Sequence, residues 1–61
     1  MNKCKCCGNL TIEEYGKYEI CENCGWEDDL HQNEDPNYSG GANALSLNDY
    51  RRKVSEEKPS I

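Results

Sequence analysis

The sequence predicts a small α+β domain whose fold depends on a bound metal ion, and three observations lead to this prediction. The chain is short and polar, with 61 residues, 34% of them hydrophobic, no phenylalanine and a mean hydropathy of -1.08. Its first 24 residues hold all five cysteines, four of them in two C-x-x-C-G motifs. A segment between these two motifs alternates apolar with polar residues, and a segment near the C-terminal end has the spacing of an amphipathic helix.

A hydrophobic core alone is not expected to hold this chain together. Folded domains of this size bury only about 60% of the surface that the unfolded chain exposes. The resulting hydrophobic gain is close to the conformational entropy that folding removes. We therefore expect the chain to need a further stabilising element and to be largely unfolded without it.

The two C-x-x-C-G motifs, residues 4–8 and 21–25, provide that element. Two such turns, called the first and the second knuckle below, can place four thiolates at the corners of a tetrahedron around one ion. The glycine after each pair allows the positive φ with which the chain doubles back. A tetrathiolate site suits zinc and also iron, the less favoured alternative. The predicted ligands of a single structural Zn²⁺ are Cys4, Cys7, Cys21 and Cys24.

Two disulfides are the competing explanation of these cysteines. Five cysteines cannot all pair, and the sequence begins without an apolar export signal. We therefore expect a reducing, cytoplasmic location in which the thiols stay available for metal. Cys6 is either a small residue tolerated in the turn or a redox-sensitive thiol and alternate ligand, favoured as thiolate by Lys3 and Lys5. With four well-spaced thiolates present, His31 is expected to be a loop residue.

A β-hairpin is predicted over residues 10–20, between the two knuckles. Residues 10–13 and 17–20 alternate apolar with polar residues, and Gly16 lies in the turn between them. Two knuckles joined by such a hairpin form a zinc ribbon. The apolar side chains of the paired strands would share one face, made of Leu10, Ile12, Tyr18 and Ile20.

A helix is predicted over residues 47–57. Ser46, with Asp49 three residues further on, has the pattern of an N-cap and its acidic partner. An apolar stripe with the spacing i, i+3 and i+7 follows and consists of Leu47, Tyr50 and Val54. We expect this stripe to dock on the hairpin face.

The remaining segments complete a single zinc-ribbon domain over residues 1–57. Residues 26–43 read as an acidic loop, and Trp26 at its start is expected to fill the space between hairpin and helix. Residues 58–61 are expected to form a flexible tail.

The charge distribution argues against nucleic acid as a partner. The formal net charge is -5, and the segment from Glu13 to Asp35 holds nine acidic residues and one lysine. A surface of this sign repels phosphate backbones. The acidic run also lacks the spacing of a calcium-binding loop, and we expect no contact with a membrane.

Several motifs together resemble the cysteine-rich CPCC family of small bacterial proteins. The resemblance covers roughly residues 4–53. It rests on these stretches: Cys4-Lys5-Cys6-Cys7-Gly8, Cys21-x-x-Cys24, Trp26-Glu27-Asp28-Asp29, Asp35-Pro36, Gly40-Gly41-Ala42-Asn43, and Ser46-Leu47 with Arg51-Arg52. Lys5 replaces the proline that the family has after its first cysteine. The resemblance implies a zinc-binding, cytoplasmic protein of bacterial or phage origin, and it implies no activity.

The sequence therefore predicts a module that binds a protein partner and is not an enzyme. No catalytic constellation stands out, and four cysteine ligands leave a zinc ion no open position for water or substrate. A rubredoxin-like electron carrier and an acidic inhibitor or immunity-type protein of an enzyme acting on nucleic acid stay open as alternatives. The expected partner surface, in the acidic loop and the C-terminal helix, consists of Glu27, Asp28, Asp29, Arg51 and Arg52.

Overall fold

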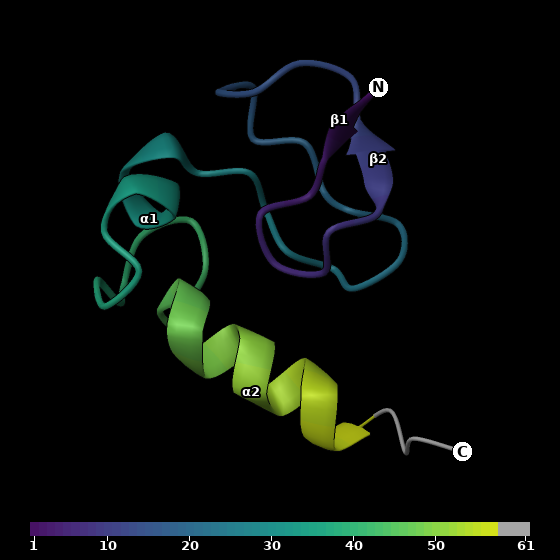
Figure 1. Ribbon diagram of the computed structural model, residues 1–61. Coiled ribbons are helices and arrows are strands. Elements are labelled where there is room, and N and C mark those ends of the chain that lie inside the picture. Colours follow the sequence, from purple (N-terminus) through teal and green to yellow (C-terminus); the bar gives the residue numbers. More distant parts are fainter. Residues whose placement is uncertain (58–61) are drawn as a thin grey trace.

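The computed structural model describes residues 1–57, which form two short strands and two helices (Figure 1). Strands β1 (Asn2–Lys3) and β2 (Leu10–Ile12) make an antiparallel pair. Helices α1 (Leu30–Glu34) and α2 (Leu47–Glu57) follow. The predicted tail, residues 58–61, lies outside the described residues.

The hairpin is not the one predicted over residues 10–20. β2 pairs with β1, placing Asn2 opposite Ile12, so the first knuckle is itself the connection between the strands. The second knuckle has the same arrangement, because Ile20 and Glu27 form an isolated antiparallel bridge across it. Each knuckle is therefore the turn of its own short antiparallel pairing.

The segment between β2 and the second knuckle replaces the predicted strand pairing with side-chain contacts. The Glu19 carboxylate accepts hydrogen bonds from the backbone N–H groups of Glu13 (3.0 Å) and Glu14 (2.9 Å). Gly16 and Tyr18 have φ angles of 85° and 56°, in the left-handed region that strands do not use. Gly16 lies in the predicted turn, whereas Tyr18 interrupts the extended backbone that the alternating pattern predicted over residues 17–20.

The predicted apolar hairpin face does not form. Ile12 is fully buried, whereas Leu10 and Tyr18 are each 61% exposed and Ile20 is 63% exposed. The core lies instead around the knuckles and the start of α2. Its buried members are Cys4, Ile12, Cys21, Trp26 and Leu47.

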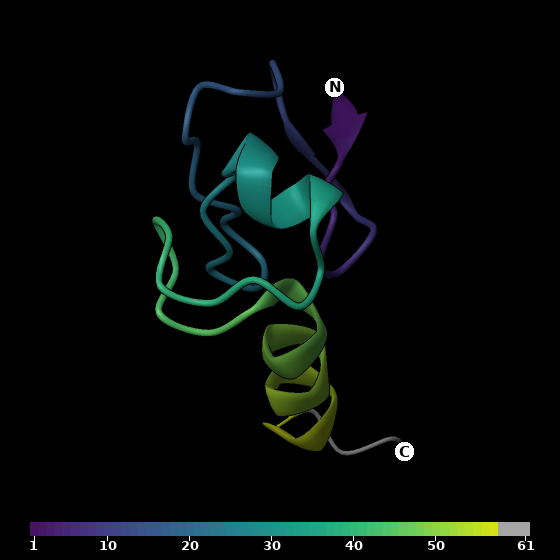
Figure 2. The same ribbon diagram turned by 90° about the vertical axis from the view of Figure 1, so that its left-hand side faces the viewer.

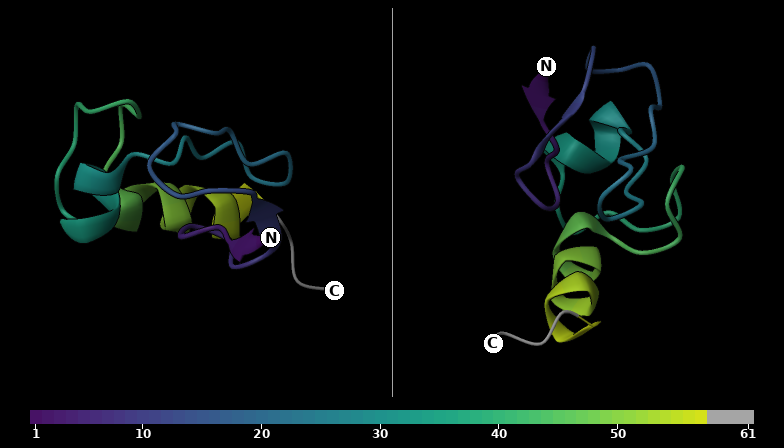
Figure 3. Two further views of the ribbon diagram at one scale, coloured as in Figure 1. Left: turned by 90° about the horizontal axis from the view of Figure 1, so that it is seen from above. Right: turned by 90° about the vertical axis from the view of Figure 1, so that its right-hand side faces the viewer.

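Helix α2 has the predicted bounds and the predicted cap. The backbone N–H of Asp49 donates to Oγ of Ser46 at 3.2 Å. Leu47 is buried, and Tyr50 and Val54 are half-buried, so the apolar stripe faces the rest of the domain. The helix begins beneath α1 and runs past both knuckle loops (Figures 2 and 3).

Trp26 packs in the core against α2, as predicted, but its other neighbours are the knuckle cysteines and Ile12 rather than the face of a hairpin over residues 10–20. Its indole is fully buried and meets the Tyr50 ring edge-on, with ring centroids 5.2 Å apart. Its Nε1 donates to Oδ1 of Asn33 at 3.0 Å, so the polar edge of the ring is also satisfied.

The predicted acidic loop contains α1 and is held by buried amide groups. Nε2 of the fully buried Gln32 donates to the carbonyl oxygens of Tyr38, Asn43 and Leu45. The Asn43 side chain exchanges two hydrogen bonds, each of 2.9 Å, with the backbone of Glu27. Within the described residues, no buried side-chain nitrogen or oxygen lacks a hydrogen-bond partner. Hydrogen bonds of buried side chains therefore order this loop, although its acidic composition is typical of a solvent-exposed segment.

Candidate metal centre

Both knuckles have the same backbone hydrogen-bond pattern. In the first, the N–H of Cys4 donates to the carbonyl of Asn9 (2.8 Å) and its carbonyl accepts from the N–H of Gly8 (2.9 Å). Cys21 makes the same two bonds in the second knuckle, at 2.9 and 2.8 Å. Gly8 and Gly25 have φ angles of 81° and 85°, which confirms the positive φ predicted after each cysteine pair.

The two knuckles bring four sulfur atoms together within 4.8 Å of one another. The sulfurs of Cys4 and Cys24 lie 3.7 Å apart, as do those of Cys7 and Cys21. Ligands at the Zn–S distance of about 2.3 Å form a tetrahedron with edges of about 3.8 Å, so both observed edges fit a bound ion. All five cysteines are free thiols, since a disulfide needs an S–S separation of about 2.05 Å. The four residues can therefore hold a metal ion.

The four thiols divide into two kinds by their acidity. Burial raises the pKa of Cys4 and of Cys24 to about 12. Burial acts in the same direction on Cys7, but hydrogen bonds from Asn9 and Asn23 outweigh it and lower the pKa of Cys7 to about 6. Four thiolates this close repel one another without a cation between them, and a divalent cation would displace the remaining protons.

Thr11 is a contact of the cluster that sequence analysis did not find. Its hydroxyl donates to Sγ of Cys21 at 3.0 Å, and the backbone N–H groups of Asn23 and Cys24 donate to the same sulfur at 3.4 Å. Burial would raise the pKa of Cys21, but these hydrogen bonds lower it. The alternating pattern had placed Thr11 only on the polar side of a strand. Its contact follows from the register of β2, for which the sequence carries no motif.

Two neighbouring residues of α2 hold one knuckle each. The Tyr50 hydroxyl donates to the carbonyl of Cys24 at 2.9 Å. Nε of Arg51 donates to the carbonyl of Lys5 at 3.1 Å, and Nη2 donates to the same oxygen. α2 therefore positions the backbone on both sides of the cluster, and part of the Arg51 guanidinium is used within the domain.

Cys6 and His31 lie outside the cluster of four. Cys6 is half-buried, and burial raises its pKa, against the expectation that Lys3 and Lys5 would favour its thiolate. His31 belongs to α1 rather than to a loop, and its ring stacks on Tyr38 with centroids 4.3 Å apart.

Two residues of the expected partner surface lie inside the fold. Asp28 is fully buried and accepts from the N–H of Gly16 and from Nδ2 of Asn33, both at 2.7 Å. Asp29 is 7% exposed and caps α1, and the N–H of Ala42, which donates to it at 2.9 Å, is the main reason that its pKa is lowered. Both carboxylates serve as acceptors for buried donors, so neither is available to a partner as predicted.

The other three residues of that surface differ from one another. Glu27 is half-buried, Arg51 is exposed but bonded to the first knuckle, and Arg52 is exposed. The Arg52 guanidinium lies 3.7 Å from the Asp49 carboxylate, one turn earlier in α2. Of the five predicted residues, Arg52 is the one whose side chain projects furthest into solvent without contacting a knuckle.

The fold and the cluster define a small cysteine-rich protein in which four clustered cysteines could hold a metal ion. The model of the family described as Cysteine-rich CPCC matches residues 2–57, so the chain belongs to this family. No curated protein matches the chain. Among the described residues, no helix is long and apolar enough to cross a membrane.

Proposed function

We infer that this protein is a non-catalytic interaction module whose fold is stabilised by one zinc ion. The observation that carries the proposal is the geometry of the sulfur cluster, with two 3.7 Å edges and all four sulfurs within 4.8 Å. Four thiolates fill the tetrahedral sphere of zinc and leave no position for water or substrate. In this interpretation the two knuckles are those of a zinc-ribbon-like domain, although each has its own hairpin.

The structural role of the ion follows from the small size of the apolar core around the two knuckles. The five buried apolar residues include two of the four proposed ligands, Cys4 and Cys21. Removing the ion would leave four sulfurs without their common ligand at the centre of this core, and Cys4 and Cys24 would have to take up protons. Zinc binding by small cysteine-rich domains contributes about 10 to 16 kcal/mol, more than a core of this size supplies.

The proposed partner is a protein that contacts the exposed side of α2. Arg52 offers an exposed charge on this side. In the alternative hypothesis of an acidic inhibitor, the partner surface consists of the exposed acidic residues, without the buried Asp28 and Asp29. A pull-down from lysate at low and at high salt would separate charge-driven partners from others. Repeating it with Arg52→Glu would distinguish the two surfaces, since the reversed charge would release a partner of α2 and retain a partner of the exposed acids.

Metal content is the decisive test of the zinc proposal. Elemental mass spectrometry on untagged protein, purified without added metal, should find one equivalent of zinc. The visible absorption spectrum of the same protein should show no band. Chelation should abolish the folded circular dichroism spectrum, and zinc should restore it. One equivalent of iron with a red chromophore would instead indicate a rubredoxin-like electron carrier, because iron accepts the same four ligands. Metal-free protein that stays folded would contradict both.

A further inference from the structure

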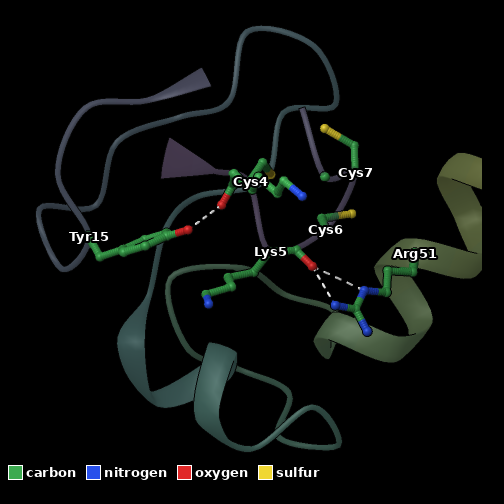
Figure 4. A pocket seen from close by; sticks show the side chains of 8 residues that line it. Cys4, Lys5, Cys6, Cys7, Tyr15 and Arg51 are labelled. Atoms are coloured by element: carbon green, nitrogen blue, oxygen red, sulfur yellow. Dashed lines mark hydrogen bonds between the residues drawn. The ribbon is translucent and has the colours of Figure 1, made fainter. Parts of the chain in front are cut away.

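The first knuckle borders a shallow open depression of about 560 Å³ beside the sulfur cluster (Figure 4). Besides the knuckle, Lys3, Tyr15 and Arg51 line it. Lys3, Lys5 and Arg51 are its charged residues, and among the side chains that the structure describes no acidic one lines it. This is an exceptional composition in a chain with twelve acidic residues and a formal net charge of -5.

Two of the three cations around the depression, Lys5 and Arg51, are held in place by contacts within the fold. Nε and Nη2 of Arg51 donate to the carbonyl of Lys5, which leaves Nη1 on the outer side of the guanidinium. The Lys5 ammonium lies 4.7 Å from the centre of the Tyr15 ring. The Tyr15 hydroxyl donates to the carbonyl of Lys3 at 2.6 Å. Side chains positioned in this way lose less conformational entropy when they bind a ligand.

The same contacts remove the groups that would repel an anion. The carbonyl oxygen of Lys3 accepts a hydrogen bond from Tyr15, and the carbonyl oxygen of Lys5 accepts two from Arg51, so each oxygen already has a donor. A zinc tetrathiolate would add two negative charges nearby, fewer than the three positive charges of the lining. Cys4 and Cys7 belong both to the cluster and to the lining, so the charges at the depression would sum to one positive charge after the metal binds.

We propose that this depression binds a phosphate group, either free or as a monoester. Ammonium groups and the outer edge of a guanidinium are the donors that proteins use for phosphate oxygens. Several cations around one opening suit a doubly charged oxyanion better than a single carboxylate. The Tyr15 ring offers the organic part of an ester a surface to pack against.

The test is a titration of the zinc-loaded protein, followed by amide NMR at constant ionic strength. The two probes are inorganic phosphate and phenyl phosphate. We expect saturable shifts at Lys5, Gly8 and Tyr15, and the probe that saturates at the lower concentration identifies the free or the esterified form. Absence of saturable shifts with both probes would overturn the proposal.

A charge-matched pair of variants shows whether the site is the depression. Lys3→Gln/Lys5→Gln removes two lining charges, whereas Lys17→Gln/Arg52→Gln removes two charges whose side chains do not line it. The first variant should raise the half-saturation concentration at least about tenfold, and the second by less than about twofold. Equal weakening in both would contradict a specific site. Unchanged zinc content and an unchanged amide spectrum establish that each variant is folded.

Discussion

At the scale of single residues, the four cluster cysteines differ in how easily each becomes a ligand. Cys7 and Cys21 receive hydrogen bonds that lower their pKa values, whereas burial raises those of Cys4 and Cys24. Each pair of close sulfurs joins one knuckle to the other, Cys4 with Cys24 and Cys7 with Cys21. Cys7, with a pKa of about 6, is thus prepared as thiolate before any ion arrives, and the pKa of Cys21 is shifted in the same direction. The remaining protons must leave when the ion binds.

Zinc affinity should rise steeply with pH. Cys4 and Cys24, with pKa values of about 12, are protonated at neutral pH in the folded metal-free chain, so zinc uptake releases at least their two protons. The apparent affinity should then increase by a factor of about 100 or more per pH unit. Competition with a chromophoric chelator between pH 6.5 and 8 measures this slope.

The pH dependence of zinc affinity also shows whether the metal-free chain is folded. If that state is unfolded, Cys7 and Cys21 return to ordinary pKa values and the number of released protons approaches four. A slope corresponding to less than one proton would contradict thiolate ligation at this site.

The hydroxyl of Thr11 should strengthen metal binding. Thr11→Val removes its hydrogen bond to Sγ of Cys21 at nearly constant volume, and zinc affinity should fall about tenfold or more. Thr11→Ser retains the hydroxyl and serves as the matched control, with affinity close to that of the parent. Chelator competition at one pH compares the three proteins. Equal affinity of the valine variant and the parent would exclude a role for this hydroxyl.

At the scale of elements, the bounds of α2 could be predicted from its sequence, whereas its contacts with the two knuckles could not. Its bounds, its Ser46 cap and its apolar stripe were predictable, because these depend on residues close together in the chain. Its contacts with the knuckles were not. Tyr50 was assigned to the stripe for its ring, and Arg51 was assigned to a partner surface for its charge, yet both donate to knuckle carbonyls.

Tyr50→Phe should loosen α2 from the second knuckle without emptying the core. The ring against Trp26 is kept, and the hydrogen bond to the carbonyl of Cys24 is lost. We expect the free energy of unfolding to fall by about 0.5 to 1.5 kcal/mol. Tyr38→Phe, on a partly exposed ring stacked against His31, is the control and should change stability by less than about 0.5 kcal/mol. Denaturant unfolding of the zinc-loaded proteins measures both, and equal effects would argue against the Tyr50 contact.

The strands were harder to predict than the helices. The alternation over residues 10–13 and 17–20 indicated two strands that pair with each other, and only β2 was found in that region. A strand pattern specifies which side chains share a face but not which backbone is the partner. Here each segment pairs across its own knuckle instead of with the predicted partner. β2 pairs with β1, and Ile20 pairs with Glu27.

At the scale of the whole molecule, hydrogen bonds join two segments at the beginning and the end of the predicted acidic loop. Residues 26–29 and 40–43 are joined through the backbone of Glu27, the carboxylate of Asp29 and the amides of Gln32 and Asn43. Both segments appear in the motif that resembles the family, and the structure gives them a packing role. They hold the loop that connects the metal centre to α2.

Gly41 should be intolerant of a side chain because of the close approach of these two segments. A Cβ at this position would lie 2.7 Å from Oδ2 of Asp29 and 2.9 Å from Cδ of Gln32. Gly41→Ala should therefore lower the free energy of unfolding by about 1 to 3 kcal/mol. Ala44→Val adds volume at an exposed position of the same loop and should stay within about 0.5 kcal/mol of the parent. A Gly41→Ala protein with the parent's thermal midpoint would show that the loop can move aside.

The sequence by itself determined the four clustered cysteines, the positive φ of Gly8 and Gly25, and the bounds of the C-terminal helix. These features depend on spacing within a few residues, which covalent geometry and local hydrogen bonds control. Only the tertiary structure decided which backbone pairs with β2, and that Asp28 and Asp29 are buried acceptors rather than surface charges. The reason is that a polar group becomes internal when the folded chain brings it a donor from a distant segment, and composition alone does not reveal that donor.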